Sequence, residues 1–150
     1  MNIICIIPAR GGSKRIKNKN ILKLNSIPLI NLVIKKIYKS KLINKIMIFS
    51  NDQNITKCVS ELNLNQKIST YSRSKKSEKD EASTEVLLKE ISLKFNFDIA
   101  VLLQITNPFI TAKIIDKALT MFIKDGYDSM LSVVPMKSFI WEKKKNTAIP

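Results

Sequence analysis

The chain has 150 residues, of which 45% are hydrophobic, and it carries a formal charge of +14. This length suits one domain with a real core, and the apolar content argues against a disordered chain. No apolar run approaches the roughly 20 residues of a membrane span, and the apolar start is too short and lacks the basic flank of a signal peptide.

The two cysteines, Cys5 and Cys58, follow no metal or redox spacing. Isolated cysteines of this kind predict buried free thiols in a reducing compartment, so we expect a cytoplasmic protein. The positive charge is almost all lysine, scattered along the chain, and basic runs such as Lys143–Lys145 have no interleaved aromatic residues. The charge therefore indicates a solvated surface, with attraction of anionic ligands or nucleic-acid binding as the alternatives.

Strand and helix patterns alternate along the chain. In order, they predict a strand at Ile3–Ile7, a helix whose first turn holds Pro28 and whose apolar positions run from Leu29 to Ile37, a strand at Lys45–Ser50, and a helix from Asp52 to about Leu62. There follow a short strand around Lys67–Tyr71, a polar loop at Ser72–Asp80, a helix from about Ser83 to Phe95, and a strand at Ile99–Leu103. A helix capped by Thr111 and closed by Gly126 precedes a last strand at Asp128–Val134.

Strands separated by helices predict βαβ units and a mainly parallel sheet. The expected fold class is therefore α/β: a three-layer α/β/α domain with a doubly wound sheet. The pattern fades after Pro135, and no closing helix precedes Pro150. We expect a single domain over residues 1–150 that is incomplete at its C-terminus.

The loop after the first strand concentrates residues that the rest of the chain avoids. Two of the three arginines and two of the three glycines lie within Arg10–Arg15. Glycine lets backbone approach a ligand, and arginine offers a fork of donors matched to phosphate oxygens. The segment matches neither a P-loop nor a dinucleotide motif. We interpret Pro8–Asn20 as a triphosphate-binding loop, with a basic surface turn as the alternative.

Three further loops follow predicted strands and share the ligand-binding edge of such a sheet. In Ser50–Asp52, a helix cap at Asp52 is favoured over ligand contact. The third loop holds Arg73 and ends in Asp80–Thr84, which either receives a polar ligand edge or forms a capping box begun by Ser83. The fourth, Gln104–Pro108, either offers an amide to a substrate or forms a hydrogen-bonded turn.

Histidine is missing from the composition. This excludes Ser-His-Asp and Cys-His catalysis and most zinc sites. Chemistry by positioning, electrostatic clamping and a divalent ion remains open.

Together the loops resemble the CMP-sialic acid synthetases, the acylneuraminate cytidylyltransferases, along essentially the whole chain. The matching segments are Ile7–Ile16, Lys19–Ile21, Pro28–Ile30, Ser50–Asp52, Arg73 with Asp80–Thr84, Leu102–Pro108, Asp128-Ser129 with Ser132-Val133, and Trp141. The resemblance implies a nucleotide-diphospho-sugar transferase fold. It also implies transfer of CMP from CTP to the anomeric hydroxyl of a sialic-acid-like nonulosonic acid, with Mg²⁺ and with release of pyrophosphate.

Site residues are implied by position. Arg10, Ser13 and Lys19 would hold the triphosphate, with Arg10 and Lys19 as the catalytic pair, and Asn20 would lie near the reacting phosphate and base. Arg73, Ala82 and Thr84 would receive the cytidine, and Gln104 would face the sugar acid. The family also implies a homodimer for a full-length protein.

Three departures from the family pattern stand out. Phe109-Ile110 replaces a Leu-Arg pair, and Ser74 replaces the proline that usually follows the arginine, which predicts a less rigid loop. The family's later segment, with dimer contacts and an Asp-x-Asp pair for Mg²⁺, has no match here, so no metal ligand is assigned. An inactive or truncated CTP-binding module is one alternative. A 3-deoxy-octulosonate cytidylyltransferase is another, although Gln104–Thr106 argues against it.

Overall fold

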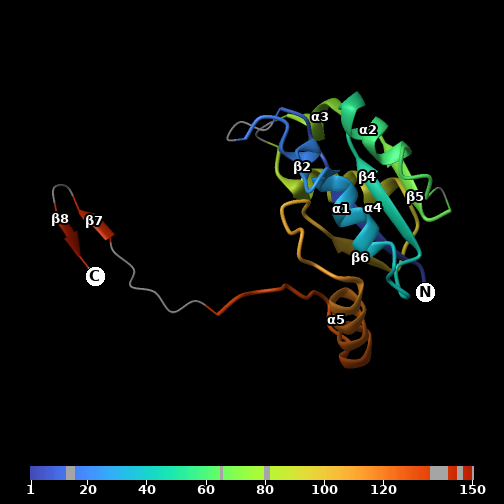
Figure 1. The fold of residues 1–150 in the computed structure, drawn as a ribbon. Helices are drawn as coiled ribbons and strands as arrows, with labels where there is room; N and C mark the ends of the chain where they lie inside the picture. The colour runs from blue at the N-terminus through green and yellow to red at the C-terminus, as the bar shows by residue number, and fades with distance from the viewer. Residues whose placement is uncertain (13–15, 65, 80–81, 136–141, 145–146, 150) are drawn as a thin grey trace.

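The computed structural model describes residues 1–12, 16–64, 66–79, 82–135, 142–144 and 147–149. The central strands are β1 (Ile3–Pro8), β4 (Lys45–Phe49), β5 (Ile68–Tyr71) and β6 (Ile99–Leu102). They form one four-stranded sheet in the order β5-β4-β1-β6, and every pairing in it is parallel (Figure 1). The parallel sheet that the alternation of strands and helices predicted is confirmed.

Five α-helices and several short elements complete the described chain. The helices are α1 (Leu29–Ile37), α2 (Gln53–Ser60), α3 (Lys75–Glu78), α4 (Thr84–Lys94) and α5 (Ala112–Asp125). The short elements are the 3₁₀ helix η1 (Lys19–Ile21), the hairpin of β2 (Lys23–Leu24) with β3 (Ile27–Pro28), and the hairpin of β7 (Glu142–Lys144) with β8 (Thr147–Ile149). Among the described residues, no helix combines the length and the apolar character needed to span a membrane.

Strand β1 lies in the middle of the sheet and is buried on both faces. Its side chains alternate between two hydrophobic clusters: Ile3, Cys5 and Ile7 belong to one, and Ile4 and Ile6 to the other. Successive side chains of a strand point to opposite faces, so a strand covered on both sides needs an unbroken apolar run. This is why the N-terminal run carries no polar alternation.

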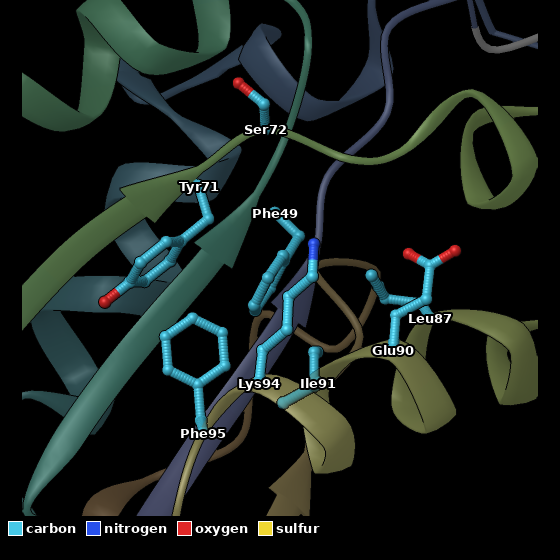
Figure 2. Close-up of a pocket in the computed structure, with 8 residues that line it drawn as sticks. All are labelled: Phe49, Tyr71, Ser72, Leu87, Glu90, Ile91, Lys94 and Phe95. Atoms are coloured by element: carbon cyan, nitrogen blue, oxygen red, sulfur yellow. The ribbon is translucent and has the colours of Figure 1, made fainter.

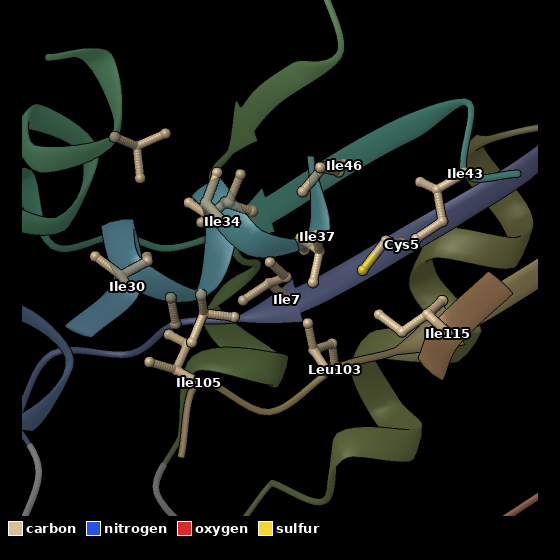
Figure 3. Packing of buried hydrophobic residues seen from close by; sticks show 14 of the residues in the cluster. Cys5, Ile7, Ile30, Ile34, Ile37, Ile43, Ile46, Leu103, Ile105 and Ile115 are labelled. Carbon is tan, nitrogen blue, oxygen red and sulfur yellow. The ribbon is translucent and has the colours of Figure 1, made fainter. Parts of the chain in front are cut away.

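Helices cover both faces of the sheet. Buried residues of α1, α2 and α5 pack with Cys5 and Ile7, as Figure 3 shows for Ile34 of α1 and Ile115 of α5. Helix α4 packs on the opposite face through Leu87 and Ile91. The result is the three-layer, doubly wound arrangement that the sequence predicted.

The two thiols differ in how deeply they are buried. Cys5 and Cys58 are both free, and Cys5 is buried whereas Cys58 is half-buried. Burial raises the pKa of the Cys5 thiol to about 12, so it stays protonated at neutral pH. The prediction of two free thiols is confirmed, but only Cys5 is fully buried.

The helix ends follow local signals that are readable in the sequence. The Asp52 side chain accepts hydrogen bonds from the backbone N–H groups of Asn54 and Ile55 and so caps α2. Thr111 caps α5 in the same way, and Gly126, at φ 67°, ends it in the left-handed conformation. The predicted caps at Asp52 and Thr111 and the stop at Gly126 are confirmed.

The last predicted strand, Asp128–Val134, is wrong. These residues form no strand in the structure, and Leu131 and Val134 are 82% and 86% exposed. Figure 1 shows the segment leading away from α5 and the sheet. An apolar pattern indicates that a segment could form a buried strand, but the pairing of that strand is a tertiary contact. No described residue pairs with this segment.

Candidate functional site

The first three loops of interest meet at one edge of the sheet. Because β1, β4, β5 and β6 run parallel, the loops that follow them all leave the carboxyl edge. A cavity of about 230 Å³ opens between the first three, and its lining consists of Arg10, Gly11, Asn51, Asp52, Arg73 and Glu78. Residues 63 positions apart in the chain, Arg10 and Arg73, therefore share one cavity.

The first loop is held by contacts of its own. Asn20 is 8% exposed, and its side-chain Nδ2 donates to the backbone carbonyl of Arg10 at 2.8 Å. A Cβ atom at Gly11 would lie 2.3 Å from the Oδ2 atom of Asp52, so a side chain at this position would force the carboxylate that caps α2 to move. The loop is thus fixed against the N-terminus of α2.

Asn51 joins the second loop to the third. Its Oδ1 accepts from the backbone N–H of Arg73 at 2.7 Å, and its Nδ2 donates to the carbonyl of Arg73 at 3.1 Å. Both polar groups of the Arg73 backbone are therefore hydrogen-bonded to Asn51, which follows β4 and Ser50. This pair of hydrogen bonds holds the backbone of Arg73 beside the second loop.

The guanidinium of Arg73 is only partly satisfied. Its Nη2 donates to the carbonyl of Ser77, whereas its buried Nε has no hydrogen-bond partner among the described residues. Burial and then the positive charge of Arg10 lower the pKa of Arg73. A buried unpaired donor costs about 1–3 kcal/mol, and an anion beside both guanidiniums would offset that cost. The site is chemically suited to a phosphate group.

Two of the described carboxylates also reach this cavity. Asp52 and Glu78 line it, and Oδ1 of Asp52 is already engaged as the cap of α2. Within the described ranges, no group of three or more His, Cys, Asp or Glu side chains has the placement to hold a metal ion. Asp128 lies in the exposed segment after α5.

Ser13, another predicted site residue, is outside the described residues. Lys19, Asn20, Ala82, Thr84 and Gln104 are described but are not among the residues that line this cavity. Lys19 is half-buried in η1. Ala82 donates its backbone N–H to the carbonyl of Lys79 at 3.0 Å, and Thr84 begins α4.

Ser83 occupies the N-cap position of α4, but its side chain makes no capping hydrogen bond to the described helix. The capping-box interpretation is therefore wrong. A capping box needs Glu or Gln three residues later, and Val86 stands there.

Gln104 lies in a turn after β6. Its carbonyl accepts from the backbone N–H of Asn107 at 3.1 Å, so the predicted turn is present, and its side chain is exposed. Nearby, Phe109 is 80% exposed at the position where the family has leucine.

Sequence reasoning missed two contributions to the cavity. It treated Asn51 as part of a motif, without its link to Arg73, and it left Glu78 inside a polar loop. The link joins residues 22 positions apart and depends on β4 and β5 being neighbours. A signal was available for Asn51, because it follows a strand that the sequence did predict.

Comparison with known proteins points to one family. A family model described as Cytidylyltransferase matches residues 4–145. N-acylneuraminate cytidylyltransferase A from Danio rerio is 32% identical over 143 residues, which cover 95% of this chain and 32% of that protein. Post-translational flagellin modification protein B from Campylobacter coli is 31% identical over 138 residues, which cover 90% of this chain and 59% of that protein.

A solved structure of CMP:2-keto-3-deoxy-manno-octonic acid synthetase complexed with CTP has a similar fold, with a TM-score of 0.69. The match covers 84% of this chain and 49% of that one at 21% identity, so it shows the α/β fold alone. The chain spans 32% and 33% of the length of two fish N-acylneuraminate cytidylyltransferases that it matches. Because the family model covers residues 4–145 of the 150, this chain belongs to the cytidylyltransferase family.

Proposed function

We propose that this chain carries the CTP-binding part of an enzyme that transfers CMP to the anomeric hydroxyl of a sialic-acid-like nonulosonic acid. One observation carries the proposal. Arg10 and Arg73 line a single cavity at the carboxyl edge of the sheet, where the buried Nε of Arg73 has no partner among the described residues. The similarity to N-acylneuraminate cytidylyltransferases over 95% of this chain supports the choice of nucleotide and of sugar.

In the proposed reaction, the oxygen of the anomeric hydroxyl bonds to the α-phosphorus of CTP, and the hydroxyl proton passes to solvent water. The bond from that phosphorus to the oxygen bridging to the β-phosphate breaks, and pyrophosphate leaves with the electron pair. Arg10, Ser13 and Lys19 hold the triphosphate, and the cations of Arg10 and Lys19 offset the charge that develops on the leaving group. Catalysis of this kind depends on position and charge, which suits a chain without histidine.

The remaining roles are proposed from the family resemblance, residue by residue. Asn20 lies near the reacting phosphate and the base, and its buried amide also holds the backbone carbonyl of Arg10. From the third loop, Arg73, Ala82 and Thr84 receive the cytidine, and the Arg73 guanidinium also attracts the phosphates across the cavity that it shares with Arg10. Gln104, exposed after β6, faces the sugar acid.

Mg²⁺ enters the proposal with the triphosphate, because this ion is usually held by substrate phosphates, several waters and one or two carboxylates. When bound, the ion would neutralise charge on the pyrophosphate. The described residues do not form a metal centre of their own, so no protein ligand is assigned and no step is derived through the ion. For the whole protein we further propose a homodimer in the cytoplasm, supported by the family resemblance and the free thiols.

Pyrophosphate release tests the proposal. The protein is incubated with CTP, Mg²⁺ and a panel of sugar acids that includes neuraminic, legionaminic, pseudaminic and 3-deoxy-octulosonic acids. We expect release with a nonulosonic acid. CTP binding without release would favour the inactive or truncated module, and release with 3-deoxy-octulosonic acid alone would favour the other cytidylyltransferase. Failure to bind CTP would overturn all three.

A further inference from the structure

Glu90, on α4, uses both carboxylate oxygens to hold the loop that follows β5. Its Oε1 accepts from the hydroxyl of Ser74 at 2.6 Å, and its Oε2 accepts from the hydroxyl of Ser77 at 2.9 Å. Ser77 is fully buried, and Ser74 is partly buried. Ser74 directly precedes the short helix α3, and Ser77 is the third residue of that helix.

These serines are also the surroundings of Arg73. Ser74 follows it directly and caps α3, because its Oγ accepts from the backbone N–H groups of Lys76 and Ser77. The carbonyl of Ser77 accepts from the Arg73 guanidinium. A continuous series of hydrogen bonds therefore runs from Glu90 through the serines to Arg73 at the cavity.

The Glu90 carboxylate is turned away from the hydrophobic surroundings of its own helix. Glu90 lines a second cavity of about 110 Å³ with Phe49, Tyr71 and Phe95. Figure 2 shows its carboxylate directed away from these rings. The Ser74 hydrogen bond lowers the pKa of Glu90, so the group is charged at neutral pH and is a strong acceptor.

We propose that Glu90 is a positioning residue for the nucleotide site: through Ser74 and Ser77 it fixes the Arg73 guanidinium beside Arg10. The inference rests on the proposed function for the identity of the ligand, CTP. Ser74, which follows Arg73 directly, is anchored to Glu90 and so restrains the loop.

The experiment measures CTP affinity by titration calorimetry in the presence of Mg²⁺. We expect Glu90→Ala to weaken binding about tenfold, which corresponds to about 1.4 kcal/mol. Glu90→Gln keeps the shape and one acceptor oxygen, so its loss should be smaller. Glu61→Ala, at the exposed end of α2, removes the same charge and controls for the general attraction of an anion; it should leave affinity unchanged.

A double-mutant cycle distinguishes positioning from a general loss of structure. In an Arg73→Ala background, Glu90→Ala should cause no further loss, because the residue through which it acts is gone. Additive losses would overturn the inference. If Glu90→Ala does not fold, Ser77→Ala takes its place in the cycle, with the exposed Ser92→Ala as its matched control.

The outcomes separate this inference from the proposed function. A wild-type chain that does not bind CTP would overturn the proposed function and this inference with it. A wild-type chain that binds CTP, with an equally tight Glu90→Ala variant, would overturn the inference alone.

Discussion

At the residue scale, Arg10 is the residue of the first loop that we expect to bind an anion. It lines the cavity with Arg73, and Asn20 holds its backbone. We expect Arg10→Ala to weaken CTP binding by about 1.5–3 kcal/mol, the range for a hydrogen bond to a charged group. Calorimetry measures the loss. Lys17→Ala, an exposed lysine of the same loop, is the control for lost charge, and an effect of equal size there would contradict a specific contact.

Gly11 sets how closely the first loop approaches α2. An added Cβ would lie 2.3 Å from Oδ2 of Asp52, closer than van der Waals contact allows. We expect Gly11→Ala to destabilise the fold by about 1–3 kcal/mol, as overpacking does, with a matching fall in the melting temperature. The double variant Gly11→Ala/Asp52→Ser should recover much of this, because serine still caps a helix but is shorter. No recovery would show that the strain lies elsewhere.

At the scale of elements, Asp116 joins α5 to the connection between α1 and β4. Its carboxylate accepts from the Ser40 hydroxyl and from the backbone N–H groups of Lys41 and Leu42. Burial raises the pKa of Asp116, but the hydrogen bond from Ser40 and the backbone bonds outweigh it, so the net pKa is lowered. The folded state therefore favours the charged form of this group.

The sign of that shift gives a pH prediction. Asp116 stabilises the fold above its unfolded pKa of about 4, and this contribution is lost as pH falls through the lower folded pKa. We expect Asp116→Asn to cost about 1 kcal/mol at pH 7, reduced from the full range for charged hydrogen bonds because the group is partly exposed. Urea unfolding of both proteins at pH 7 and pH 3 measures it. A difference that grows at pH 3 would refute the prediction.

The elements that the sequence predicted share one property: each carries a local pattern. Caps such as Asp52 and Thr111, the stop at Gly126 and the unbroken run of β1 can all be identified within a few residues. Helix α3 was missed because its four residues, Lys75–Glu78, are too short to show a period. Strand pairing for Asp128–Val134 was wrongly expected because pairing is a contact between distant segments.

The candidate site divides in the same way. Arginine and glycine usage indicated the first loop, and the parallel strands then imply which loops are neighbours. The link from Asn51 to Arg73 joins residues 22 positions apart, and the hydrogen bonds of Glu90 join residues up to 16 positions apart. No local sequence pattern indicates either contact. Their partners become visible only when the strands and helices are in place.

At the scale of the whole molecule, ion pairs among the described residues leave most of the +14 charge unneutralised. The chain has 26 basic and 12 acidic side chains. Within the described ranges, one ion pair joins the N-terminal amine to Asp98 at 4.0 Å, with both groups about half exposed. Most lysines lie on the surface, where their charges create a long-range field that attracts any polyanion.

We therefore expect DNA and RNA to bind this chain weakly and without sequence preference, through counterion release alone. The affinity should fall steeply between about 50 and 200 mM salt, because each neutralised phosphate adds about −0.9 to the slope of log K against log salt concentration. CTP makes few ionic contacts in comparison, so its affinity should fall much less over the same range. Fluorescence anisotropy with two unrelated oligonucleotides, beside CTP calorimetry at matched salt, measures both. Nanomolar, sequence-dependent binding at physiological salt would contradict this prediction and indicate that a nucleic acid is the specific ligand. A surface of scattered lysines cannot explain such binding, because it offers neither stacking residues nor base-edge contacts.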